Sequence, residues 1–134
     1  AASLLVSKDY ISATVSANSS ANEYLLAPMI DARRMEVFTA VYDVELNVDL
    51  IPQSMILDPN SFAAFLNKKK IFFFGSGSGK WKNVCNHSNA NFASASMSGE
   101  VIVSLCNEKF LHKEFAILTY CEPVYLKEFY IHHK

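Results

Sequence analysis

The strongest constraint on the fold is a pair of strand-like segments that are joined by a short charged turn. Residues 25–30 form an apolar run, and residues 35–42 are rich in Val, Phe, Thr and Tyr. Both compositions are typical of buried or half-buried β-strands. Asp31, Arg33 and Arg34 stand between the two runs, where an Asp side chain can bond to the backbone of a tight turn. The pattern predicts a β-hairpin with a charged tip.

The charged tip has two interpretations that the sequence leaves open. It is a structural turn, or it is a partner-binding site in which Arg33 or Arg34 presents its guanidinium to a carboxylate or phosphate. Asp31 and Glu36 flank the two arginines and belong to the same candidate group. The set predicts a functional surface or a plain turn, and it does not by itself name an activity.

The next segments extend the hairpin into a mixed sheet. Residues 50–57 predict a third strand, which Pro52 places at a sheet edge or bulge, so three consecutive strands form an antiparallel meander. Asp58 and Pro59 predict a helix start, with Asp as N-cap and Pro in the first turn. Residues 71–74 predict a buried strand. Together these segments indicate an α/β fold with crossover helices.

The remaining segments add a helix and an apolar tail. Residues 92–93 predict a brief strand, and a helix should run from the serines at 94–98 to about residue 111. Cys106 on that helix is expected to be a core residue. Residues 117–129 carry an apolar or aromatic side chain at almost every second position. We therefore expect this tail to dock on the domain.

A glycine-rich turn, Gly75-Ser76-Gly77-Ser78-Gly79-Lys80, follows the buried strand. It is not a Walker phosphate loop, because Phe74 stands where the first glycine is needed and Trp81 replaces the magnesium-binding Ser or Thr. It is not GxGxxG either, since the third glycine comes one residue early. The turn around Gly75 and Gly77 lets the backbone approach another group closely. Two interpretations stay open: the turn approaches a nucleotide base or sugar, or it is a structural turn that binds no ligand.

Composition and charge exclude several classes of protein. The 134 residues are 51% hydrophobic, which suits one soluble domain with a real core, and no apolar run is long enough to span a membrane. The net charge of -1 supplies no general attraction to nucleic acid. Three cysteines without a CxxC pair, Cys85, Cys106 and Cys121, predict buried thiols in a reducing cytoplasm. Because the first residue is Ala1 and not Met, and an apolar stretch follows at residues 4–6, we expect a piece cut from a longer protein. Residues 4–6 also predict the end of a strand, and residues 10–17 predict a helix.

The sequence contains no motif of a known catalytic or metal centre. HExxH and GxSxG are absent, and no cysteine has a histidine at a catalytic spacing. His87 has no neighbours at metal-ligand spacing. We therefore expect a non-catalytic protein that needs no metal.

Four stretches give the chain a resemblance to a known family, the TsaB-type proteins, which are the non-catalytic subunits of the bacterial machinery for tRNA threonylcarbamoyladenosine. Residues 28–42, PMIDARRMEVFTAVY, resemble the "DAR…EVY" segment of this glycoprotease-like family. The other three stretches occur in the family's order: the helix start Leu57-Asp58-Pro59 with Phe62, the turn Phe74-Gly75-Ser76-Gly77, and the ending Glu122-Pro123-Val124-Tyr125-Leu126-Lys127-Glu128-Phe129.

The resemblance implies one lobe of an actin-like or ribonuclease H-like ATPase fold, with residues 1–134 as the C-terminal lobe of a two-lobed protein. It implies a scaffold or activator that works with a catalytic threonylcarbamoyl transferase paralogue and an associated ATPase subunit. Members of the family pair with themselves or with the catalytic paralogue mainly through the half that is absent here. The apolar face exposed by that absence predicts a homodimer of this chain, and tRNA is contacted only indirectly. Gly75 and Gly77 sit where nucleotide-binding members of the superfamily hold adenosine. No cofactor is expected for this chain alone, and ATP or ADP would bind only in the full complex.

Two other functions stay open. One is a nucleotide-binding kinase-like or ATPase lobe of the same superfamily, suggested by the strand-GxG-helix turn. The other is a nucleic-acid-binding module, which has only the lysines at 68–70 in its favour. Nucleotide binding and salt-dependent tRNA binding, respectively, would distinguish them from the scaffold.

Overall fold

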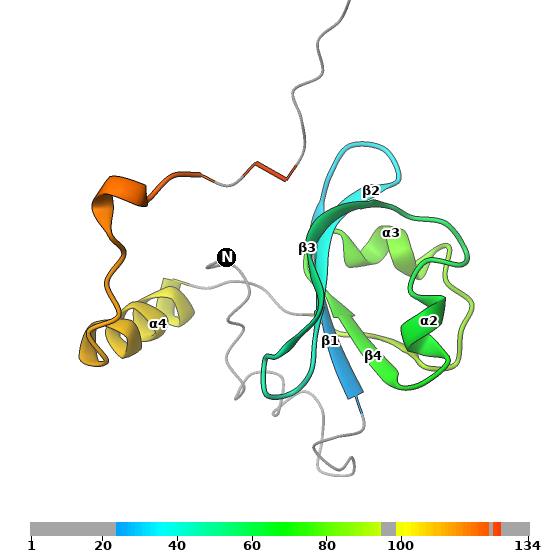
Figure 1. The fold of residues 1–134 in the computed structure, drawn as a ribbon. Helices are drawn as coiled ribbons and strands as arrows, with labels where there is room; N and C mark the ends of the chain where they lie inside the picture. Colours follow the sequence, from blue (N-terminus) through cyan, green and yellow to red (C-terminus); the bar gives the residue numbers. More distant parts are fainter. Residues whose placement is uncertain (1–23, 95–98, 124, 127–134) are drawn as a thin grey trace, which may run out of the picture.

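A five-stranded mixed sheet forms the centre of the protein in a computed structural model that describes residues 24–94, 99–123 and 125–126 (Figure 1). The strand order is β3-β2-β1-β4-β5. β1 to β3 form an antiparallel meander, whereas β4 runs parallel to β1 and β5 runs parallel to β4. The predicted α/β class with a mixed sheet is confirmed. The strands are β1 (Tyr24–Asp31), β2 (Glu36–Tyr42), β3 (Val48–Ile56), β4 (Lys70–Phe74) and β5 (Ala90–Phe92).

The main hydrophobic core lies between one face of the sheet and two short helices. α2 (Ala63–Leu66) and α3 (Ser78–Lys82) provide the crossovers from β3 to β4 and from β4 to β5. Trp81 of α3 is fully buried, and its ring lies 5.5 Å from that of Phe62 and 5.9 Å from that of Phe73. Leu57 and Leu66 also belong to this core. The strands supply its other members: Leu25, Ala27, Met29, Val37, Val41 and Ile71.

The helix predicted to start at Asp58 and Pro59 begins later than the sequence indicates. Asp58 accepts a bond from the Asn60 backbone N–H at 2.7 Å, and its own N–H donates to the Ser61 hydroxyl at 2.9 Å. Those bonds form a turn, and Phe62 follows with φ of 63° before α2 begins. The left-handed residue places an aromatic ring in the core, so burial of Phe62 decides where the helix starts.

The predicted burial of the C-terminal segments is wrong for the residues that the structure describes. A helix ending at residue 111 is confirmed as α4 (Gly99–Leu111), and a 3-10 turn, η2 (Leu118–Tyr120), follows it. Cys106 and Cys121 are exposed and Cys85 is half-buried, against the expectation of buried thiols. An apolar pattern shows which side of a segment is apolar but not what covers it. The exposed apolar side chains include Val103, Phe110, Leu111, Phe115, Ile117 and Leu118.

The strand end expected at residues 4–6 and the helix expected at 10–17 lie outside the described residues. Within the described part, α4 is the longest helix, and no helix is long and apolar enough to cross a membrane.

Candidate functional site

The two candidate motifs meet at one edge of the sheet. β1, β4 and β5 are parallel to one another, so their carboxyl ends, at Asp31, Phe74 and Phe92, lie on the same edge. In open α/β sheets this is the edge where ligands bind. The hairpin after β1 and the glycine-rich turn after β4 therefore face each other, although the sequence places them more than 40 residues apart.

Gly75 and Gly77 allow the glycine-rich turn to contact the backbone of β1. Gly75 has φ of 93°, and a Cβ there would lie 2.4 Å from the Met29 carbonyl oxygen. A Cβ at Gly77 would lie 2.8 Å from Cγ1 of Val37, and the Gly77 N–H donates to the Met29 carbonyl at 3.0 Å. Gly79 differs, because a Cβ there would meet nothing within 4 Å. The close approach that the sequence predicts is therefore present. Gly75 approaches β1, and Gly77 approaches both β1 and β2.

Lys80 of α3 joins the turn to the hairpin. Its ammonium group forms an ion pair with the carboxylate of Asp31 and donates to the backbone carbonyls of Ala32 and Arg34. A longer bond, 3.4 Å, reaches the carbonyl of Glu36. An ammonium group has three donors and no acceptor, so it suits a position among several carbonyl oxygens. Lys80 thus binds the carbonyl oxygens of the turn between β1 and β2.

The hairpin tip, residues 32–35, is fixed by further backbone bonds. The Ala32 N–H donates to the Glu36 carbonyl at 3.1 Å, and the Leu57 N–H donates to the Met35 carbonyl at 2.7 Å. The Asp31 N–H donates to the Ser76 hydroxyl at 3.0 Å. Arg33 and Arg34 are exposed. The backbone of the tip is therefore held by groups of the domain itself, while its two arginines are exposed to solvent.

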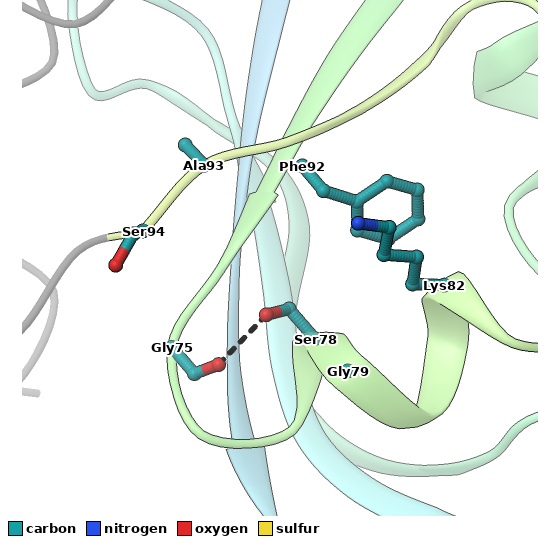
Figure 2. Close-up of a pocket in the computed structure, with 7 residues that line it drawn as sticks. All are labelled: Gly75, Ser78, Gly79, Lys82, Phe92, Ala93 and Ser94. Atoms are coloured by element: carbon teal, nitrogen blue, oxygen red, sulfur yellow. Dashed lines mark hydrogen bonds between the residues drawn. The ribbon is translucent and has the colours of Figure 1, made fainter.

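A cavity of about 350 Å³ lies beside the same turn, at the carboxyl ends of β4 and β5 (Figure 2). Lys82 is the charged side chain of its lining, and the ring of Phe92 forms part of the wall. The Ser78 hydroxyl donates to the Gly75 carbonyl at 2.8 Å, as Figure 2 shows. Its lining consists of Gly75, Ser78, Gly79, Lys82, Phe92, Ala93 and Ser94.

The structure separates the sequence candidates into two groups. Asp31 and the carbonyl of Glu36 face Lys80, and Gly75 and Gly77 face β1 or β2, whereas the side chains of Arg33 and Arg34 are at the surface.

Sequence reasoning missed Lys80 and Ser76 as partners of the hairpin. The sequence signal that could have indicated these contacts is the buried strand at 71–74. Parallel pairing of this strand with β1 brings the hairpin and the glycine-rich turn to the same end of the sheet. Among the described residues, no group of three or more His, Cys, Asp or Glu side chains could hold a metal ion.

The fold is similar to solved structures from Pseudomonas aeruginosa. One is an uncharacterized protein with similarity to peptidase YeaZ, which shares 25% identity over 77% of this chain with a TM-score of 0.53. Another is YeaZ, with 24% identity over 76% of this chain and a TM-score of 0.48. This chain spans about half, 49%, of each matched chain. No family model and no curated protein matches the sequence.

Proposed function

We propose that the chain is a TsaB-type, non-catalytic scaffold or activator in the threonylcarbamoyladenosine modification of tRNA. In this proposal residues 1–134 are the C-terminal lobe of a two-lobed cytoplasmic protein. Its partners are the catalytic threonylcarbamoyl transferase paralogue and an associated ATPase subunit. The chain alone has no transfer activity, and tRNA is contacted only through the complex.

The observation that carries this proposal is that the two resembling motifs are packed against each other. The DAR segment supplies Asp31 and the carbonyls that Lys80 binds, and the GxG turn supplies the close contact with β1. The polar groups of both motifs hold one element of this chain to another. The 25% identity and TM-score of 0.53 with the YeaZ-like structure support the same family.

Deletion of the gene that encodes this chain tests the proposal. We expect threonylcarbamoyladenosine to disappear from total tRNA, as measured by mass spectrometry of the nucleosides, and to return when the gene is supplied on a plasmid. A catalytic paralogue supplied in the same way is the control and should not restore the modification. An unchanged level of the modified nucleoside after deletion would refute the proposed function.

A nucleotide-binding lobe is the second candidate, and the cavity beside Gly75 favours it. The cavity lies at the carboxyl ends of two parallel strands, and Lys82 places a positive charge on its wall. Calorimetric titration with ATP and ADP distinguishes the candidates. Saturable binding that Lys82→Met weakens, and that Lys68→Met leaves unchanged, would favour the nucleotide-binding lobe.

The assembly state is a separate part of the proposal. The chain forms a homodimer, or it assembles only with the paralogue. The exposed apolar side chains of residues 102–120 offer a surface through which two copies could associate. Sedimentation velocity over a range of concentrations measures it. A monomer at every concentration would refute self-association but leave the scaffold role intact.

A further inference from the structure

We infer that the hairpin tip is a docking point for an acidic surface of a protein partner, with Arg33 and Arg34 as the residues that contact it. The identity of that partner rests on the proposed function, but the inference about the tip's chemistry does not. The argument uses the rigidity of the tip, the charge left on it and the character of the neighbouring side chains.

The tip is rigid because groups from α3 and from the end of β3 form hydrogen bonds with its backbone. Lys80 binds the carbonyls of Ala32 and Arg34 from α3, and the Leu57 N–H binds the Met35 carbonyl from the end of β3. In Figure 1 the loop between β1 and β2 extends beyond the sheet. A loop that is fixed before binding loses less conformational entropy when a partner arrives.

The tip itself, residues 32–35, carries the two positive charges of Arg33 and Arg34, and Glu36 follows them at the start of β2. Asp31 neutralises Lys80 through their ion pair, so neither group is left to compensate the arginines. Neither Arg33 nor Arg34 forms an ion pair with another residue in the described part of the chain. A guanidinium group offers a fork of donors that matches a carboxylate in a bidentate geometry.

The backbone conformation of Arg34 is unfavourable for an arginine. Its φ of 64° lies in the left-handed region, which glycine or asparagine adopts more easily. Residues in this backbone region cluster at functional sites, although Leu46, Phe62 and Lys113 of this chain also have positive φ. Glycine would be less strained at this position, so the proposed binding role accounts for an arginine there.

Apolar side chains next to the arginines favour a protein over a nucleic acid. Met35 is 38% exposed and Ile30, at the end of β1, is 48% exposed. Arginine and methionine are both enriched in protein interfaces. Nucleic-acid binding depends on many phosphate contacts, whereas this tip carries two cations on a chain of net charge -1.

The first experiment probes the tip without assuming the partner. A hexaglutamate peptide is titrated into the ¹⁵N-labelled chain, and amide shifts are followed by NMR. We expect saturable shifts at residues 31–36 that disappear in Arg33→Gln/Arg34→Gln. They should persist in Lys68→Gln/Lys69→Gln, which removes two exposed charges elsewhere. Shifts centred on residues 68–70, or tighter binding of a hexamer of single-stranded RNA at the tip, would overturn the inference.

The second experiment uses the purified transferase paralogue as the probe. Arg33→Glu/Arg34→Glu should weaken its affinity about tenfold or more, while Lys68→Glu/Lys69→Glu should leave it unchanged. Equal affinities for the two variants would overturn the inference. If the paralogue binds no form of the chain while the peptide result holds, the proposed function fails and the inference stands.

A third variant separates binding from folding. Arg34→Gly relieves the left-handed backbone, so its melting midpoint should rise while its affinity for the peptide falls. A structural role alone for Arg34 predicts a higher midpoint with unchanged peptide affinity, and that result would overturn the inference for this residue.

Discussion

The two turns of the antiparallel meander are held by different means. The tip between β1 and β2 depends on groups from a distant segment. Ser76 contacts Asp31, next to the tip, from 45 residues away, and Lys80 contacts Ala32 of the tip from 48 residues away. The turn between β2 and β3 holds itself, since the Asp43 carboxylate accepts bonds from the backbone N–H groups of Glu45 and Asn47 at 2.9 and 2.8 Å. The β1–β2 turn is therefore stabilised by tertiary contacts, whereas the β2–β3 turn is stabilised by hydrogen bonds among its own residues.

This difference affects what each turn can do. A self-contained turn forms wherever its few residues occur, because a local side chain supplies the acceptor. The distant contacts fix the β1–β2 tip only after β4 and α3 have packed beside β1. Its arginines are therefore positioned only in the folded protein, and variants that loosen α3 should affect this tip more than the β2–β3 turn.

Trp81→Ala should give the largest effect, because this side chain anchors the helix that carries Lys80. The indole is fully buried among Phe62 and Phe73, and its loss leaves a cavity that should lower the free energy of unfolding by about 4 kcal/mol. Urea denaturation followed by circular dichroism measures this. Trp81→Phe is the control and should cost less than about 1.5 kcal/mol, because the indole N–H has no partner among the described residues. Equal losses would contradict the packing role.

Gly75→Ala tests whether the glycine-rich turn must contact β1. The added Cβ would meet the Met29 carbonyl oxygen, and alanine is strained at φ of 93°, so we expect a loss of about 3 kcal/mol. Gly79→Ala is the matched control in the same run of glycines. It has open space and lies in α3, so it should raise stability by about 0.5 kcal/mol. Similar losses for both variants would show that the contact with β1 is unimportant.

The sequence predicts the local features of this fold well and the distant contacts poorly. The hairpin at 25–42, the edge position of the strand containing Pro52 and the strand at 71–74 follow from alternation, turn residues and apolar runs. The contact between Lys80 and Asp31 does not, because no local pattern states that β1 pairs with β4.

The errors have the same physical origin. The apolar pattern of residues 99–126 predicts a buried side, but burial requires an opposing surface that the pattern does not specify. The helix expected at Asp58 begins at residue 63 because Phe62 packs its ring against Phe73 and Trp81. Both features depend on tertiary contacts.

Lys80→Met tests the distant support of the β1–β2 tip directly. The ammonium group donates to the half-buried carbonyl of Ala32 and the exposed carbonyl of Arg34. Bonds of charged groups typically contribute about 2 kcal/mol, so a loss of up to about that size is expected. Lys82→Met removes the same charge from the same helix at an exposed position and should change stability by less than about 0.5 kcal/mol. Hydrogen exchange at residues 32–36 should increase in the first variant only. Unchanged hydrogen exchange at these residues would show that Lys80 does not stabilise the tip.

Asp43→Asn tests the self-contained turn through pH and should give the smallest effect. The side-chain bond from Asn47, with further bonds from the backbone, lowers the Asp43 pKa below its ordinary value of 3.8. The native state therefore binds this proton less tightly than the unfolded chain does. The stabilisation is fully present above the ordinary value and is lost as pH falls through the lower native pKa. Melting midpoints of the wild type and Asp43→Asn should differ at about pH 6 and converge toward about pH 2. Asn47→Ala removes the main donor and should reduce the same pH dependence, whereas Lys82→Met, at an exposed position, should not. A constant difference between wild type and Asp43→Asn across this range would show that the turn does not depend on the charge of its own carboxylate.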